Sequence, residues 1–180
     1  MSNFFILFIC LGVAVVMLLA YAATAPDEFR VERRLRIAAP PDKLWPLVGE
    51  LGGFNRWNPY ERKDPLIKTR YDGAASGVGS RYAWESDKVG TGSMEIVEQQ
   101  PGRAVQMRLD FLKPFEAHNR AEFALQPTAD GATEVSWTMH GPANFVSKLM
   151  GVFIDMDKMV GRDFEDGLQN LRQLAEGRAS

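Results

Sequence analysis

The hydrophobic pattern of this chain changes its period at Gly141-Pro142, and this change limits the possible folds more than any other feature. Between residues 64 and 140, apolar and polar side chains alternate, most clearly in "RAVQMRLDF", which is typical of antiparallel strands with one buried face. Beyond Pro142, apolar residues recur at steps of three and four up to Leu174, which predicts one amphipathic helix of about 30 residues. The expected core is therefore a sheet covered on one face by that helix, an α+β fold.

Two further segments precede the run of strands. "FRVERRLRIAAP" alternates and predicts a first strand, and "PDKLWPLVGEL" predicts a short helix. Gly52-Gly53 breaks the chain before the aromatic stretch "FNRWNPYE", whose rings we expect to follow a second short helix, with Trp57 buried as a plug at the cavity end. The predicted order is strand, two short helices, antiparallel strands and a long C-terminal helix.

The first 26 residues carry no charged side chain, whereas all 21 basic and 23 acidic residues lie at or after residue 27. As a helix, the run from Phe4 to Ala23 would be about 30 Å long, the thickness of a bilayer core. Its Leu, Ile, Val and Phe residues favour insertion by about 4–7 kcal/mol. We therefore expect residues 1–26 to be a single-pass transmembrane anchor with a linker, and residues 27–180 to be one folded domain.

A cleaved signal peptide is the alternative for this segment, because Ala20-Tyr21-Ala22 has the A-x-A form of a cleavage site. However, no basic residue precedes the apolar run, which is also longer than a typical signal core. The orientation is predicted from Arg30, Arg33, Arg34 and Arg36, which follow the run and favour a cytoplasmic domain.

Charge and cysteine content exclude several classes of function. The formal net charge of −2 gives no electrostatic case for binding nucleic acid. Cys10 is the only cysteine and lies in the apolar run, so one chain offers no disulfide framework, thiolate metal site or catalytic thiol. We expect no metal and no cofactor.

With these elements in place, the chain resembles the START / Bet v 1-like (SRPBCC) superfamily, in particular bacterial polyketide cyclase/dehydrase-like proteins. The resemblance covers about residues 29–176 and rests on "RVERRLRIAAPPDKLWPLVGEL", "FNRWNPYE", the strand meander and "DMDKMVGRDFEDGLQNLRQL". It implies a helix-grip fold, in which a curved antiparallel sheet wraps a long helix around an apolar cavity that binds lipids, sterols, polyketides or similar ligands. The anchor is not part of the family pattern and adds a location, the bacterial inner membrane.

Under a helix-grip fold, the large inward-facing side chains are the best candidates for a ligand-lining wall. Asn119 is the strongly polar residue among them, and ordinary core packing is the alternative for each one. The predicted ligand-binding residues are Trp57, Tyr82, Trp84, Met107, Phe111, Asn119, Phe123, Trp137, Met139, Phe153 and Met156.

No catalytic residue is predicted. Strand parity turns His118 and His140 away from the apolar face, and the acidic residues of the long helix are expected to form local ion pairs on a solvated face. These observations favour membrane-anchored binding of a hydrophobic small molecule or lipid without catalysis. A polyketide cyclase/dehydratase-like enzyme acting on a hydrophobic substrate is the alternative, and an interaction protein with a fully packed core is a third possibility.

Overall fold

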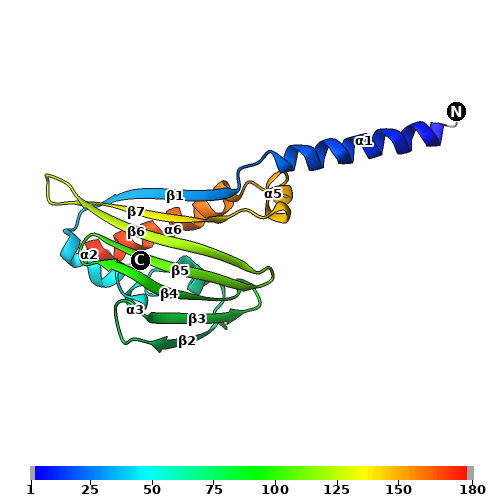
Figure 1. Cartoon of the computed structure of the whole chain (residues 1–180). Coiled ribbons are helices and arrows are strands. Elements are labelled where there is room, and N and C mark those ends of the chain that lie inside the picture. The colour runs from blue at the N-terminus through cyan, green and yellow to red at the C-terminus, as the bar shows by residue number, and fades with distance from the viewer. Residues whose placement is uncertain (1–2, 178–180) are drawn as a thin grey trace.

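A long curved sheet grips one C-terminal helix, and an N-terminal helix projects from one end of the molecule (Figure 1). This computed structural model describes residues 3–177. Residues 1–2 of the predicted anchor and residues 178–180 of the predicted domain lie outside the described part. The seven strands form one antiparallel sheet in the order β1-β7-β6-β5-β4-β3-β2. They are β1 (Glu28–Ile37), β2 (Lys68–Gly73), β3 (Ser80–Ser86), β4 (Gly90–Gln100), β5 (Ala104–Lys113), β6 (Ala117–Pro127) and β7 (Thr133–Pro142).

Six helices accompany the sheet in the described residues. They are α1 (Asn3–Ala23), α2 (Pro41–Val48), α3 (Leu51–Phe54), α4 (Pro59–Lys63), α5 (Phe145–Gly151) and α6 (Met156–Glu176). The predicted helix-grip architecture is confirmed. The first predicted short helix is α2, and the second is present as two shorter pieces, α3 and α4. Asn58-Pro59 divides these pieces, since the Asn58 side chain accepts a hydrogen bond from the Tyr60 backbone N–H at 3.1 Å and so begins α4.

Alternation along the strands places their apolar side chains in rows across the inner face of the sheet. One row runs from Ile96 through Met107 and Ala121 to Met139 and Val31, which the antiparallel register pairs in turn. All five side chains are buried. The predicted strand parity is therefore confirmed, and it determines which residues face α6.

The prediction of a single helix of about 30 residues after Pro142 is wrong, because α5 and α6 are separate helices. The Asp155 side chain accepts a hydrogen bond from the Lys158 backbone N–H at 2.9 Å and so caps the start of α6. Apolar residues recur at helical spacing through the break, but no residue of α5 is buried. The helical spacing of apolar residues therefore runs through both helices, but the apolar residues of α6 face the core whereas those of α5 are not buried.

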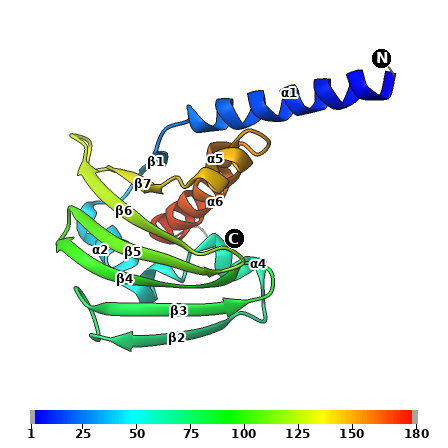
Figure 2. The same cartoon turned by 45° about the vertical axis from the view of Figure 1, so that its right-hand side comes forward.

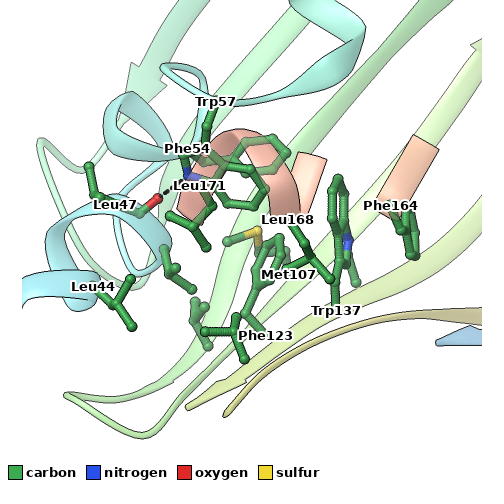
Figure 3. Packing of buried hydrophobic residues seen from close by; sticks show 14 of the residues in the cluster. Leu44, Leu47, Phe54, Trp57, Met107, Phe123, Trp137, Phe164, Leu168 and Leu171 are labelled. Carbon is green, nitrogen blue, oxygen red and sulfur yellow. Dashed lines mark hydrogen bonds between the residues drawn. The ribbon is translucent and has the colours of Figure 1, made fainter. Parts of the chain in front are cut away.

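Aromatic side chains join α6 to the sheet and to the short helices (Figure 3). The rings of Trp137 on β7 and Phe164 on α6 stack with centroids 4.0 Å apart and planes 8° from parallel. A Cβ at Gly167 would lie 2.6 Å from the Trp137 ring, so glycine is needed for this close approach. The packing brings α6 against β7 with little space between them.

Trp57 fills the space between the short helices and this aromatic pair (Figure 3). Its ring lies 5.5 Å from those of both Phe123 and Trp137, and its indole N–H donates to the Leu47 carbonyl oxygen at 2.7 Å. The side chain is fully buried, which confirms the expectation that Trp57 is a buried plug.

Ion pairs connect α6 to other elements, which corrects the expectation of local pairs on a solvated helix face. Arg33 of β1 reaches Asp157 at 2.9 Å and Glu165 at 2.7 Å, and Lys63 of α4 reaches Asp163 at 2.6 Å. The hydrogen bond from Arg33 lowers the pKa of the Asp157 carboxyl below its ordinary value. Sequence spacing could not reveal these partners, since they come from distant segments.

Replacing Trp57 with Ala should reduce the free energy of unfolding by about 3–5 kcal/mol, because it removes a fully buried ring and leaves the Leu47 carbonyl without its donor. Denaturant unfolding of the detergent-solubilised chain, followed by circular dichroism, measures the change. Arg56→Ala, at an exposed neighbouring position, is the control and should change stability by less than about 0.5 kcal/mol. Equal stability of the two variants would contradict burial of the Trp57 ring.

Candidate ligand-binding site

Two half-buried rings lie on the inner face of the sheet near the ends of β3 and β5. Trp84 and Phe111 both pair with Gly92 of the intervening strand β4. A Cβ at position 92 would lie 2.5 Å from the Trp84 ring, so the absence of a side chain lets this ring lie over β4. The rings of Trp84 and Phe111 meet edge to face with centroids 5.8 Å apart. They form an apolar wall that is only partly covered.

The first turns of α6 expose two thioether side chains beyond the packed part of the core. Met156 and Met159 are 40% and 51% exposed, whereas Val160 and Phe164 further along α6 are buried. Met159 precedes Asp163 by one helical turn and so lies on the side of α6 that faces α4. We call Trp84, Phe111, Met156 and Met159 the mouth of the grip. Flexible methionines and partly covered rings are both suited to apolar ligands of irregular shape.

A polar cluster lies between α4, α6 and β3. The Tyr82 hydroxyl donates to Glu61 at 2.5 Å, and the Tyr60 hydroxyl is hydrogen-bonded to Asp163, which also pairs with Lys63. The Lys63 ammonium lies 4.9 Å from the centroid of the Tyr60 ring. Sequence reasoning missed this cluster. Tyr60 and Glu61 are part of the aromatic stretch, but no sequence signal indicates that Asp163, about 100 residues later, is their neighbour.

Burial raises the pKa of Tyr60 well above the usual range, and the nearby Asp163 carboxylate adds to this effect. Burial raises the pKa of Tyr82 in the same way, with a further contribution from Glu61. Both phenols are therefore neutral near pH 7 and act as hydrogen-bond donors. A general acid or base needs a pKa near the operating pH, so this environment suits these two hydroxyls to hydrogen bonding more than to proton transfer.

Asn119 is 7% exposed on the inner face of β6, which confirms its predicted inward orientation. It pairs with Leu109 of β5, one row further into the sheet than Phe111. Its side-chain carbonyl oxygen has no hydrogen-bond partner among the described residues. A buried acceptor without a donor is costly, so this amide either reduces stability or serves a ligand.

The predicted ligand-binding residues fall into three groups in the structure. Four of them, Trp57, Met107, Phe123 and Trp137, lie in the tightly packed half of the core. Tyr82, Trp84 and Phe111 form a chain of ring contacts toward the mouth, with Asn119 and Met139 buried nearby. Phe153 and Met156 are exposed at the break between α5 and α6. The fold thus brings Tyr82, Trp84 and Phe111 into ring contact at the partly covered edge of the core that contains the first group.

The resemblance implied an apolar cavity between the sheet and the long helix, but the interior is packed where α6 meets β7. The sheet and α6 meet through stacked rings rather than across an open cavity. Two shallow pockets hollow the described surface elsewhere, one next to Asp64, Leu66 and Lys88 and the other next to Leu51, Tyr71 and Arg81. Among residues 3–177, no group of three His, Cys, Asp or Glu side chains is placed to hold a metal ion.

Both histidines lie on the outer face of the sheet, as strand parity predicted. His140 pairs with the exposed residues Arg30 and Arg120. His118 Nδ1 lies 2.8 Å from a carboxylate oxygen of Asp110, and this hydrogen bond is the main reason that the pKa of His118 is raised. The residue is an exposed partner in an ion pair rather than part of the mouth.

The segment Ile6–Ala23 of α1 has a mean hydropathy of 2.8 and is almost entirely uncovered by the rest of the described chain. Its length and composition suit a membrane span, and a signal sequence near an N-terminus meets the same criteria.

Sheet, gripped helix and apolar mouth define a helix-grip protein. The sequence model of the family described as polyketide cyclase / dehydrase and lipid transport matches residues 28–176. The chain therefore belongs to this family, which confirms the resemblance seen in the sequence and supports a role with a hydrophobic ligand. No curated protein sequence matches the chain.

Solved structures share the fold at low sequence identity. Protein MLL2253 from Mesorhizobium loti has a TM-score of 0.61 and 19% identity, over 84% of this chain and 100% of that one. CalU16 from Micromonospora echinospora has a TM-score of 0.54 and 19% identity, over 87% of this chain and 88% of that one. DynU16, from the dynemicin biosynthetic locus, has a TM-score of 0.58 and 15% identity, over 84% of this chain and 48% of that one. These likenesses concern the fold alone.

Replacing Asn119 with Leu should raise the free energy of unfolding of the ligand-free chain by about 1 kcal/mol, because it removes a buried acceptor that lacks a donor. Denaturant unfolding of the purified chain tests this. Asn58→Leu is the matched control. Asn58 is also buried but has partners in Asn55 and Tyr60, so its loss should destabilise the fold. Comparable destabilisation by both substitutions would show that the Asn119 amide has partners of its own.

Replacing Asp110 with Asn should lower the pKa of His118 toward its ordinary value of about 6.5, because the hydrogen-bonded carboxylate that favours the imidazolium is lost. NMR titration of the imidazole C–H signals measures the pKa. Asp130→Asn, at the opposite end of the sheet, should leave the His118 titration unchanged. An unchanged His118 titration in Asp110→Asn would contradict the ion pair.

Proposed function

We propose that this chain binds a hydrophobic small molecule or lipid at its mouth while α1 anchors it in a membrane. The observation that carries the proposal is the partly covered apolar wall of Trp84 and Phe111, together with the exposed thioethers of Met156 and Met159 on α6. Folded domains rarely leave such a surface at the end of a core without a partner for it. Family membership supports the same class of ligand.

The buried and the partly covered parts of the proposed site differ in their packing. The Trp137–Phe164 stack and the buried Trp57 provide a fixed inner boundary. A ligand at the mouth would replace water on Trp84 and Phe111, at a gain of about 25 cal/mol for each Å² of apolar surface covered. Asn119, one row further in, offers an amide for a polar group of the ligand. Tyr82 and Tyr60 keep the adjoining carboxylates hydrogen-bonded and the site's edge polar.

A cyclase- or dehydratase-like activity is the second candidate, and the hydrogen-bonded pairs Tyr82–Glu61 and Tyr60–Asp163 beside the mouth are the observation in its favour. The two candidates differ in the fate of the ligand. Binding alone returns the ligand unchanged from both the wild type and Tyr82→Phe. Catalysis by the pair would convert a substrate in the wild type and leave it unconverted in Tyr82→Phe.

The membrane side of the domain is also part of the proposal. All four arginines that follow α1 lie on β1, and they favour the cytoplasmic side of the inner membrane. Accessibility of an engineered cysteine at Val78 to a membrane-impermeant reagent, in intact cells and in inverted vesicles, distinguishes the two orientations in a Cys10→Ser background.

Replacing Met159 with Glu should lower ligand occupancy by about tenfold or more, since a carboxylate at the mouth must be desolvated against an apolar ligand. Native mass spectrometry and lipid analysis of the full chain, purified in mild detergent, measure the occupancy. Val78→Glu makes the same change at an exposed apolar residue in the β2–β3 loop and should retain the ligand. An empty wild-type chain, or equal occupancy of the wild type and Met159→Glu, would refute binding at the mouth.

A further inference from the structure

Helix α5 and the turn that follows it are apolar and have almost no cover from the sheet. No residue of α5 is buried, and Phe145, Val146 and Ile154 are all exposed. Phe153 is 72% exposed, an unusual environment for a phenylalanine on a folded domain. The predicted long helix is interrupted at this surface. The apolar side chains of this segment therefore face away from the core.

Several contacts hold α5 beside the C-terminal end of α1. Only residues 24–27 separate α1 from β1. The Asp27 carbonyl oxygen accepts from the Ala143 N–H at 2.8 Å, and the Asp27 carboxylate pairs with Lys148 of α5 at 2.6 Å. Ala22, near the end of α1, is fully buried. Both views of the molecule show α5 next to the point where α1 leaves the domain (Figures 1 and 2).

The tip of the β5–β6 hairpin lies at the same end of the molecule. In the antiparallel register, β1 begins, β7 ends and β5 ends on one side of the sheet, the side from which α1 projects (Figure 1). The hairpin tip carries Leu112 and Phe115, and Phe115 is 66% exposed. Two apolar projections from different elements therefore face the side on which α1 extends.

We propose that these residues insert into the interfacial layer of the bilayer that α1 spans, so that the domain is docked on the lipid surface and not merely tethered to it. We call the set the docking rim: Leu112, Phe115, Phe145, Val146, Phe153 and Ile154. The inference rests on the membrane anchoring in the proposed function.

Chain length makes lipid the partner of the docking rim. Four linker residues span at most about 14 Å when fully extended, so the start of β1 stays near the bilayer surface at which α1 ends. The contacts of Asp27 with Ala143 and Lys148 keep α5 at that level. Lys148, the charged residue of α5, has its charge neutralised by Asp27, so the rim enters the interface without an unpaired ammonium.

Docking would also define the route of the ligand. Leu112 follows Phe111 directly, and Ile154 lies two residues before Met156, so the rim borders the mouth on both the sheet and the helix. A hydrophobic molecule that leaves the bilayer at the rim would reach the mouth without crossing bulk water.

Fluorescence quenching in proteoliposomes of phosphatidylcholine and phosphatidylglycerol, doped with nitroxide-labelled lipid, tests the inference on the full chain. A bimane label on the natural Cys10 reports on the anchor. In a Cys10→Ser background, labels on Val146→Cys and Phe115→Cys report on the rim. A label on Val78→Cys, an exposed apolar position at the opposite end of the sheet, is the matched control.

Docking predicts that nitroxides at a shallow acyl position quench the labels at 146 and 115 at least threefold more than the label at 78. If the Cys10 label is quenched while positions 146 and 115 behave like 78, the docking inference is overturned and the anchor stands. If the Cys10 label is not quenched by nitroxides at any depth, the anchor itself is refuted, together with the docking that depends on it.

Discussion

The stack of Trp137 on Phe164 is the contact on which the rest of the structure depends. It brings α6 within direct ring contact of β7, and Gly167 removes the side chain that would prevent this approach. Trp57 then closes the same cluster from the side of the short helices, with its indole N–H satisfied by Leu47. These rings fill the interface between β7 and α6, and the partly covered apolar surface lies elsewhere, at Trp84 and Phe111.

Ion pairs connect the first half of α6 to β1 and α4. Arg33 joins β1 to two carboxylates of α6, and Lys63 joins α4 to Asp163. Exposed pairs of this kind contribute little to stability singly. Their effect here is positional, since they hold the first turns of α6 near β1 and α4 while Met156 and Met159 remain uncovered.

The mouth, the polar cluster and the anchor lie at related positions. Trp84 and Phe111 belong to strands that end on the side from which α1 extends, and the docking rim follows directly from Phe111 and from the break before α6. If α1 spans a membrane as proposed, a binding site at that end of the fold has a short path to the bilayer. Under the proposed anchoring, this arrangement gives α1 a physical purpose, because a ligand that partitions into lipid is most concentrated there.

The sequence by itself determined the architecture of this protein, since alternation, helical spacing and a charge-free N-terminal run are local patterns that report directly on burial. It also identified the inward orientation of Asn119 and the burial of Trp57. Only the tertiary structure decided that α5 breaks away from α6, because apolar spacing is the same whether a helix faces a core or another apolar phase. The partners of Asp157, Asp163 and Tyr82 likewise required the fold. Their contacts join segments far apart in the chain, and no local pattern encodes which distant side chain will lie opposite.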